Sequence, residues 1–369
     1  MGKEFASATA RWCHLPRMAL RPEVTAICSA HPSPERTRWY TENFPTIRRV
    51  TDDYREVLQS GDVDAVYIAV PHNLHEEIFV AAVAAGKHVL GEKPFGIDLK
   101  ANEAILAAIR AHPACLARCA SQYIFYPAAQ RILRMFDQNA FGRILAVDGE
   151  FSHSSDLNPD KPINWKRKNA FNGEYGVMGD LGVHLALVPA RAGWALDNVR
   201  AICSKIISQR PDGQGGMAPC ETWDNATLLA QLRDAATGDA FPLSLALNRI
   251  RPGEKNTWRI AVYGTKACAR FSLKNPRRLE LLEYRGGEQA WQQIDMGFET
   301  AYETITGGIF EFGSVDAFMQ MMASFLYELE HGKPLSRAAA CPTPEETHWC
   351  HRLFTAALES NRTGKTAQG

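Results

Sequence analysis

The sequence has few of the features that mark secreted, membrane-embedded or nucleic-acid-binding proteins. No apolar run is long enough to cross a bilayer, and the first twelve residues lack the continuous apolar core of a secretory signal. Lysine and arginine together number 41, and so do aspartate and glutamate. This balance gives no attraction for nucleic acid or an anionic membrane. We therefore expect a cytoplasmic protein.

Disulfide frameworks and common metal-binding patterns are also absent. The nine cysteines are an odd number without a CxxC pair, which indicates reduced thiols in a cytoplasm. The stretch "HWCH" at 348–351 contains metal-ligand residue types, but it lies in a helical pattern. We therefore predict neither a disulfide-stapled fold nor a metal site.

The first third of the chain alternates buried-strand and helical patterns. At 369 residues the chain exceeds one ordinary core, so two domains are expected. The runs at 23–30 and 63–71 are β-branched and almost fully apolar, as buried parallel strands are. Helical patterns occupy 33–44, 52–60 and 75–86. This alternation predicts a doubly wound parallel sheet in an α/β domain.

After about residue 127 strand-like segments follow one another through turns instead of helices. They read "GRILAVDGEFSH", "VRAICSKIIS", "NATLLAQLRD", "FPLSLALNRIR", "TWRIAVYGTKACARFSL" and "RRLELLEYR". One helical pattern interrupts them at 176–194, and two more close the chain near 313–331 and 343–361. We predict a second, α+β domain with a mostly antiparallel sheet over residues 128–369, after a first domain over 1–127.

The hexapeptide "GEKPFG" at 91–96 follows a short buried strand. It holds Glu92, Lys93 and Pro94 between two glycines. In doubly wound sheets ligands bind outside the carboxyl ends of the strands, and these charged residues occupy one such end. The stretch is therefore a candidate ligand site.

Asp180 and His184 are four residues apart in the helical pattern at 176–194. This spacing places both side chains on one helix face, about 6 Å apart at Cβ. Alone, the pair suits a helix surface or a buried structural histidine. Gly179 and Gly182 lie around it, although a glycine inside a helix costs about 1 kcal/mol relative to alanine. The close approach of a ligand or of another backbone would explain them.

Residues 66–105, which contain "GEKP", and "GVMGDLGVHLALV" at 176–188 together resemble the glucose–fructose oxidoreductase/inositol dehydrogenase (Gfo/Idh/MocA) family. The similarity runs from about residue 14 to the end. Members are mostly NAD(P)-dependent oxidoreductases of sugars, cyclitols and glycosides, with a Rossmann domain and an open-faced sheet domain. The resemblance implies NAD or NADP as cofactor and a sugar or glycoside as substrate. It also implies a homodimer or homotetramer joined through the C-terminal sheet, whose apolar face must be covered.

The family pattern assigns roles to the charged residues. Lys93 would reach the nicotinamide ribose and the substrate hydroxyl, with Glu92 beside it. A positive charge there stabilises the alkoxide that forms as hydride leaves carbon. His184, with a pKa of about 6.5 if unperturbed, is suited to take the hydroxyl proton. Asp180 would orient the substrate or the imidazole.

Further cofactor-binding candidates come from the same resemblance. The stretch at 69–75 matches the family loop beneath the dinucleotide, although an ordinary strand-to-helix turn has the same pattern; its candidates are Pro71, His72, Asn73 and His75. Gln122 would end a strand facing the nicotinamide. Ser29 stands where NAD-preferring members carry an acidic residue for the adenosine ribose, which leaves NADP open.

A substrate wall is implied by the stretch before the Asp–His pair. Its candidates are Trp165, Arg167 and Tyr175. Tryptophan can stack on the apolar face of a sugar while charged neighbours, such as Lys166, bind hydroxyls.

One departure concerns the phosphate loop. The family opens with an apolar strand that runs into G-x-G-x-x-G, whereas those glycine positions are here Ala6, Ala8 and Arg11. Only residues 1–5 remain to serve as the first strand, and the helix N-terminus near Ser7 would offer amides to a phosphate. A methyl group at the second position narrows the approach to the pyrophosphate. Three explanations stay open: an altered loop that works, a chain that begins downstream of its relatives' start, or weak dinucleotide binding.

Three functions are therefore considered. The first is a sugar or glycoside dehydrogenase or reductase. The second is a glycoside-cleaving or epimerising enzyme that oxidises its substrate transiently, without net turnover of NAD(P). The third is a non-catalytic sensor of a sugar or dinucleotide. Lys93, Asp180 and His184 together argue against the sensor, because a sensor needs no general base.

Overall fold

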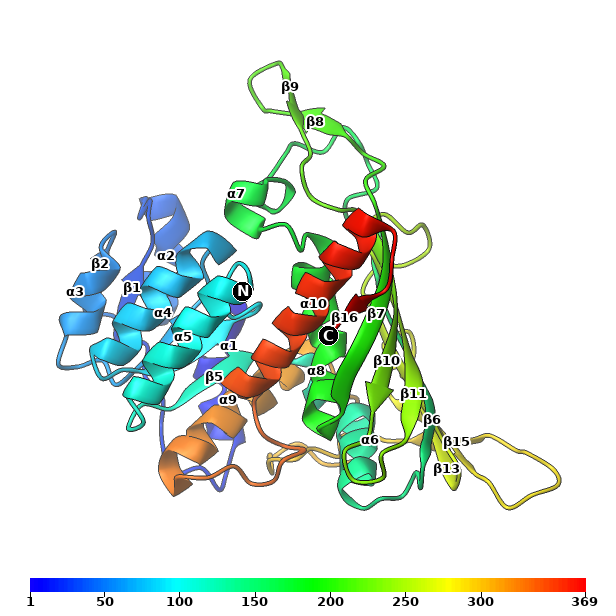
Figure 1. The fold of residues 1–369 in the computed structure, drawn as a ribbon. Helices are drawn as coiled ribbons and strands as arrows, with labels where there is room; N and C mark the ends of the chain where they lie inside the picture. The colour runs from blue at the N-terminus through cyan, green and yellow to red at the C-terminus, as the bar shows by residue number, and fades with distance from the viewer.

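Parallel strands alternating with helices form the N-terminal third of the computed structural model, which describes residues 1–369 (Figure 1). The elements are α1 (Gly2–Ala10), β1 (Ala26–Cys28), α2 (Pro34–Asn43), β2 (Arg49–Thr51), α3 (Tyr54–Gln59), β3 (Ala65–Ile68), α4 (His75–Ala84), β4 (His88–Glu92), α5 (Leu99–Ala111) and β5 (Ala117–Ala120). All pairings among these strands are parallel. The predicted parallel α/β arrangement is confirmed.

This parallel sheet is divided into two pieces. Strand β1 pairs only with β2, while β3, β4 and β5 form a separate three-stranded sheet. In a doubly wound sheet the first strand of the chain lies between the strands that β1 and β3 represent here. The expectation that residues 1–5 form this strand is wrong, because they enter α1 instead. The Phe5 ring of this helix stacks on the Tyr67 ring of β3, with centroids 4.0 Å apart.

A nine-stranded sheet dominates the rest of the chain. Its elements are α6 (Pro127–Asp137), β6 (Ile144–Ser152), α7 (Asn169–Asn172), α8 (Val183–Ala192), β7 (Ala195–Ser204), β8 (Gln209–Pro211), β9 (Met217–Pro219), β10 (Asn225–Arg233), β11 (Ala240–Asn248), β12 (Thr257–Gly264), β13 (Ala267–Ser272), β14 (Arg278–Glu283), β15 (Gln292–Asp295), α9 (Ser314–His331), α10 (Pro344–Thr363) and β16 (Ala367–Gln368). The order is β15-β14-β13-β12-β6-β11-β10-β7-β16. Only β11 and β6 pair in parallel, so the predicted mostly antiparallel sheet is confirmed.

The apolar face of this sheet is covered by the chain's own helices. Helices α6, α8 and α10 lie along it (Figure 1). On β10 the alternation is clear, because Leu228, Ala230 and Leu232 are buried while Leu229 between them is exposed. The outer face is therefore mixed instead of largely apolar. The buried apolar face gives no reason of its own for a second copy of the chain.

Local sequence signals begin and end the helices that join the two regions. The Asp98 carboxylate accepts a hydrogen bond from the Ala101 amide at the start of α5. Thr343 and Glu346 form a capping box at the start of α10, and Gly364 ends this helix with a φ of 68°. Because α10 contacts α5, α8 and β7, it connects the parallel strands to the large sheet.

The predicted division near residue 127 coincides with the start of α6 at Pro127. Helix α6 itself was not expected, although proline at its first turn and an apolar repeat indicate a helix. Helices α9 and α10 contact α1 and α5 of the first region. The domain boundary therefore stays a prediction.

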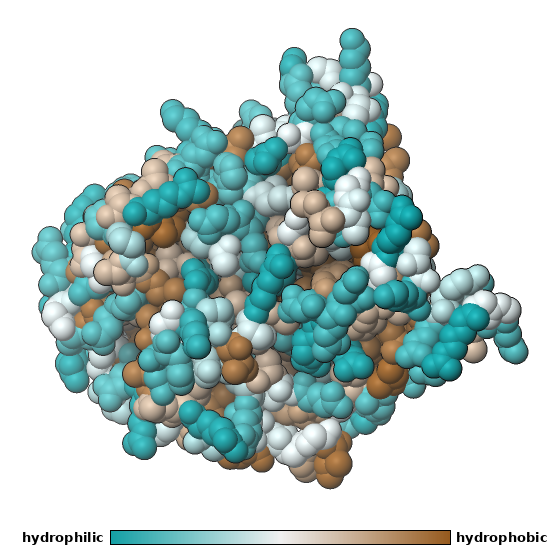
Figure 2. Space-filling model, turned by 60° about the horizontal axis from the view of Figure 1, so that its bottom comes forward, coloured by the Kyte–Doolittle hydropathy of each residue, from teal (hydrophilic) through white to brown (hydrophobic).

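The surface offers no extended apolar belt on the side shown in Figure 2, where apolar and hydrophilic residues are interspersed. None of the helices combines the length and the apolar character that crossing a bilayer requires.

Gly91 allows α4 to pack closely on β4. A Cβ at Gly91 would lie 2.1 Å from Cζ of Phe79, whose ring is confined by His75 and Phe95. We expect Gly91→Ala to lower the free energy of unfolding by about 1–3 kcal/mol, because the ring cannot move without repacking. Urea denaturation measures this. The control Gly61→Ala, which meets no atom within 4 Å, should change it by less than about 0.5 kcal/mol, and equal effects would contradict the argument.

Candidate active site

Lys93 leaves the end of β4 and reaches across to the large-sheet region. Its Nζ donates to the backbone oxygen of Asp180 at 2.7 Å and to Oδ1 of the same residue at 2.8 Å. Only 12% of the Lys93 side chain is exposed. Glu92 has a different partner, because its Oε1 accepts from the Tyr67 hydroxyl at 2.5 Å. The two charges of "GEKP" therefore serve two separate contacts.

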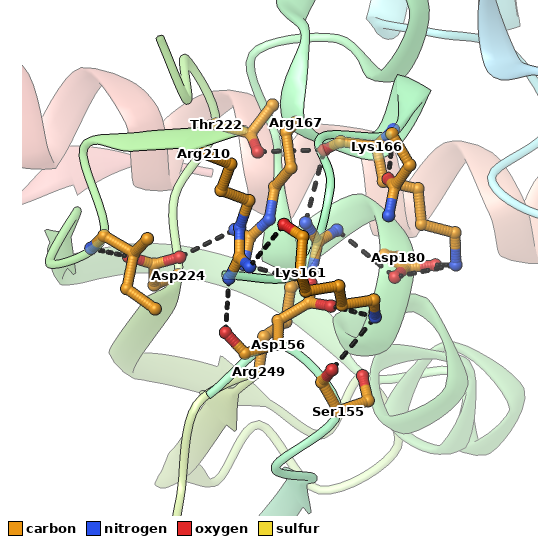
Figure 3. Close-up of polar contacts among 12 residues, drawn as sticks. Ser155, Asp156, Lys161, Lys166, Arg167, Asp180, Arg210, Thr222, Asp224 and Arg249 are labelled. Carbon is orange, nitrogen blue, oxygen red and sulfur yellow. Dashed lines mark hydrogen bonds and ion pairs between the residues drawn. The ribbon is translucent and has the colours of Figure 1, made fainter. Parts of the chain in front are cut away.

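The Asp180 carboxylate forms ion pairs with three cationic side chains. Besides Lys93, its carboxylate contacts Lys166 Nζ at 3.0 Å and Arg249 Nη2 at 3.2 Å, and Figure 3 shows the latter two around it. Burial opposes ionisation of this carboxyl, but Lys166, Lys93 and Arg249 together hold its pKa well below the usual range. Asp180 is therefore a carboxylate at neutral pH.

His184 lies in the first turn of α8 and is 5% exposed. Its Nδ1 lies 3.0 Å from Ser121 Oγ, and its backbone oxygen accepts from Trp258 Nε1 at 3.1 Å. The Tyr123 ring stands edge-on to the imidazole, with centroids 4.6 Å apart. Burial, and next the charge of Lys93, lower the pKa of His184 well below 6.5, so the ring is neutral at neutral pH.

The helix carrying Asp180 and His184 differs from the expected one. Residues 178–182 form a π-helical turn before α8 begins, and the Asp180 carboxylate contacts cations instead of the His184 ring. A Cβ at Gly179 would lie 3.7 Å from Pro94 Cγ, and one at Gly182 only 2.8 Å from Leu247 Cδ1. The two glycines thus allow close packing of the π-helical turn against the Lys93 loop and the large sheet.

The loop at 71–75 is anchored by its histidines. His72 Nδ1 lies 3.1 Å from the backbone oxygen of Asn172, and His75 Nε2 lies 3.1 Å from that of Val70. Both rings are buried, and burial lowers the pKa of His75 to about 4. Asn73 differs, because its Oδ1 is buried without a hydrogen-bond partner. Pro71 is half-buried at the start of the loop. Asn73 Oδ1 and His75 Nδ1, which also lacks a hydrogen-bond partner, are thus the two unused acceptors of the loop.

The predicted substrate wall is only partly assembled. Trp165 is half-buried, and its ring stands edge-on to His72 at 5.0 Å. Arg167 is fully buried in ion pairs, and Tyr175 bonds to Thr355 Oγ1 of α10 at 2.7 Å. The expectation that Arg167 and Tyr175 line a substrate cavity is therefore corrected, since both support the wall from behind.

The remaining cofactor candidates occupy different places. Gln122 lies two residues beyond the end of β5, and Ser29 directly follows β1, so their contacts with nicotinamide and ribose stay predictions. Ser7 lies in the middle of α1 instead of near its N-terminus, so the expected role of its amide is wrong. The free amides of this helix belong to its first turn, which begins at Gly2.

Two residues of the site were not predicted. Ser121 forms a hydrogen bond with the His184 ring, and Arg249 donates one to the Asp180 carboxylate. Each directly follows a strand end, β5 and β11, which is the only sequence signal for them. Their partners lie 63 and 69 residues away, beyond the reach of spacing arguments.

The "HWCH" stretch lies behind the Lys93 loop. The His351 ring is 1% exposed and packs edge-on against Tyr175, with centroids 5.4 Å apart. Burial lowers the pKa of His351 to about 3. This histidine therefore supports the site in its neutral form.

We predict a loss of stability in acid that depends partly on His351. In the unfolded chain the pKa is about 6.5, so the unfolded state gains this proton as pH falls from about 6.5 while the folded state stays neutral down to about 3. The free energy of unfolding of the wild type should fall when the pH is lowered from 7 to 5. In His351→Phe this fall should be smaller by about 1–2 kcal/mol. Urea denaturation at both pH values measures this. The exposed control His31→Phe should follow the wild type, and a parallel loss in His351→Phe would contradict the assignment.

Known proteins match both regions of the chain. Residues 2–118 match the model of an oxidoreductase family with an NAD-binding Rossmann fold, and residues 129–270 match the model of the GFO/IDH/MocA C-terminal domain. Levoglucosan dehydrogenase of Pseudarthrobacter phenanthrenivorans is 26% identical over 68% of this chain. The dTDP-3,4-didehydro-2,6-dideoxy-alpha-D-glucose 3-reductase of Actinomadura kijaniata is 33% identical over 46% of it. The alignments span 65% and 48% of these two relatives.

The fold is shared with a solved structure of levoglucosan dehydrogenase in complex with NADH and L-sorbose. The TM-score is 0.88 over 100% of this chain and 95% of that one, at 22% sequence identity. The likeness confirms the predicted fold class.

Proposed function

Because this chain belongs to the GFO/IDH/MocA family of oxidoreductases, we propose that it transfers a hydride between a nicotinamide cofactor and a sugar, cyclitol or glycoside. The reacting group would be a secondary hydroxyl or the corresponding ketone. The observation that supports this is the contact of Lys93, which directly follows β4, with Asp180 of the π-helical turn, beside His184 of α8, whose pKa the Lys93 charge lowers. The two curated relatives, a sugar dehydrogenase and a sugar reductase by name, agree with it.

In the proposed mechanism Lys93 supplies the positive charge and His184 the base. The Lys93 ammonium, fixed by Asp180, stabilises the alkoxide that develops on the substrate hydroxyl. Ser121 holds Nδ1 of His184, so Nε2 is the atom that takes the hydroxyl proton. The lowered pKa of His184 keeps this nitrogen unprotonated at neutral pH. Bound NAD or NADP would accept or donate the hydride.

The residues present fit the nicotinamide end of such a cofactor better than its phosphates. Lys93 and the unpartnered Oδ1 of Asn73 offer polar contacts at one end, and Ser29 offers a hydroxyl at the other. The phosphates would meet only the first turn of α1, since no strand joins β1 to β3. Ser29 leaves the choice between NAD and NADP open.

We therefore expect weak dinucleotide binding. A fluorescence titration with NADH and NADPH should give a Kd on the order of 1 mM, about −4 kcal/mol, because few backbone amides close on the pyrophosphate. Free adenosine and nicotinamide mononucleotide serve as half-ligand controls. Low-micromolar binding of either dinucleotide would show that α1 suffices.

The second prediction for the mechanism separates the roles of Lys93 and His184. Lys93→Met should lower the hydride-transfer rate and dinucleotide affinity together, because it removes both the charge and the ribose contact. His184→Asn should lower the rate by roughly 10²–10⁴-fold and leave dinucleotide affinity nearly intact. Asp180→Asn should fall between them. Single-turnover kinetics with NAD(P)+ and a sugar, beside direct titration, measure both quantities.

The pH profile gives an independent readout. Since burial lowers the pKa of His184, the acidic limb of kcat/KM should lie below pH 6.5 and disappear in His184→Asn. A folded His184→Asn with full turnover would refute the mechanism. Turnover of a glycoside without net NAD(P)H formation would instead support transient oxidation, and binding without turnover would support a sensor.

We also propose that the outer face of the large sheet joins copies of the chain into a homodimer or homotetramer. Leu145, Ile202 and Leu229 are 55%, 65% and 56% exposed on its strands β6, β7 and β10. Light scattering at micromolar concentration should detect the oligomer, and Leu229→Lys should weaken it, while Leu335→Lys, an exposed leucine outside the sheet, should not. A monomeric wild type would contradict this proposal.

A further inference from the structure

The immediate surroundings of Asp180 carry more positive charge than its carboxylate balances. Lys93, Lys166 and Arg249 all contact this one carboxylate, at 2.8, 3.0 and 3.2 Å. One negative charge offsets one of the three cations, so two positive charges remain. His153 also lies close by, and burial lowers its pKa, so it contributes no charge at neutral pH.

The charged residues next to this cluster do not supply the missing negative charge (Figure 3). Arg167 pairs with Asp156 at 3.0 Å and with Asp224 at 2.6 Å, and Lys161 contacts Asp156 at 2.7 Å. Arg210 donates to backbone carbonyls, including that of Asp156. These three cations face two carboxylates, so this layer adds a further positive charge.

The excess charge reaches solvent at Lys166. The exposed fraction of its side chain is 40%, whereas those of Lys93 and Arg249 are 12% and 1%. Its Nζ lies 5.8 Å from the centre of the half-buried Trp165 ring. Glu92, the other carboxyl near Lys93, is already bonded to Tyr67, and counting it still leaves an excess of positive charge.

Unbalanced positive charge in a largely buried site raises the free energy of the folded protein unless an anion binds there. A neutral sugar would bring hydroxyl groups but no charge to Lys166. A carboxylate or phosphate there would form charge-assisted hydrogen bonds, which are about twice as strong as neutral ones. The Trp165 ring beside it offers a surface for the sugar ring.

We propose that the substrate is an acidic sugar, whose carboxylate or phosphate binds Lys166 beside Asp180. This inference rests on the proposed function, since it names the class of substrate for the same site. Uronic acids, aldonic acids and sugar phosphates share the required chemistry. In this arrangement Asp180 keeps Lys93 at the reacting hydroxyl, and Lys166 is the residue that selects the charged substrate.

The test compares matched neutral and acidic ligands by isothermal titration calorimetry. Glucose is compared with glucuronate, gluconate and glucose 6-phosphate, and galactose with galacturonate. The wild type should bind at least one acid about tenfold or more tightly than its neutral counterpart. Lys166→Met should lose about tenfold in affinity for that acid and less than about threefold for the neutral sugar. Lys166→Arg should retain most of the selectivity, and the exposed control Lys168→Met should behave as the wild type.

The outcomes separate this inference from the proposed function. Equal affinities for neutral and acidic sugars, or a selectivity unchanged in Lys166→Met, would overturn the acidic-sugar assignment. Hydride transfer to NAD(P)+ from neutral sugars alone would support the oxidoreductase function, but it would overturn the acidic-sugar assignment. Acid-selective binding without hydride transfer from any sugar would keep the anion site and refute the oxidoreductase. The carboxylate and phosphate ligands distinguish the two kinds of anion.

A titration with NADH identifies which ligand Lys166 serves. Dinucleotide affinity should be unchanged in Lys166→Met. If this affinity falls while the preference for acids persists, Lys166 serves the cofactor phosphates and the proposal is wrong.

Discussion

The ion pair between Lys93 and Asp180 connects the two regions of the molecule at the point where the chemistry is proposed. Lys93 directly follows β4, and Asp180 belongs to the π-helical turn that precedes α8. A buried pair is stabilising only when further hydrogen bonds satisfy both groups. Here the Asp180 backbone oxygen accepts a hydrogen bond from Lys93, and Arg249 donates a further hydrogen bond to the Asp180 carboxylate. The position of the Lys93 ammonium therefore depends on both regions.

Helix α10 holds both sides of this pair from behind. The amide of Asn102 on α5 donates to the backbone oxygen of Phe95 and to Thr347 Oγ1 on α10. On the other side, Tyr175 bonds to Thr355 of the same helix. A helix late in the chain thus positions the loop after Lys93 and the turn before Asp180. Helix α10 therefore positions the site but does not take part in the proposed reaction.

The divided parallel sheet has the opposite consequence for the cofactor. Strands β3, β4 and β5 lead to the residues proposed for the nicotinamide end, and they pair with one another. Strand β1, which leads to Ser29, belongs to a separate pair with β2. The two ends of a bound dinucleotide would therefore rest on pieces of sheet that share no hydrogen bonds. In the proposed binding mode, this arrangement would support the nicotinamide end more firmly than the adenosine end.

Much of this protein follows from patterns within short stretches of its sequence. The alternation of apolar runs and helical stretches predicts the parallel strands, because each element must bury one face. The turn chemistry after residue 127 likewise predicts the antiparallel sheet. The motif around Lys93 and the pair Asp180 and His184 identify the site through a family resemblance, since both lie within continuous segments.

Contacts between distant segments were decided by tertiary structure alone. Sequence spacing suggested that Asp180 and His184 face each other, whereas packing gives Asp180 to Lys166 and Arg249, and His184 to Ser121. The burial of a side chain such as Tyr175 depends on which helix covers it, and that helix comes from the far end of the chain. The charge balance around Asp180 is of the same kind. Electrostatic energy depends on distances in space, and residues separated by tens of positions become neighbours only when the chain is folded.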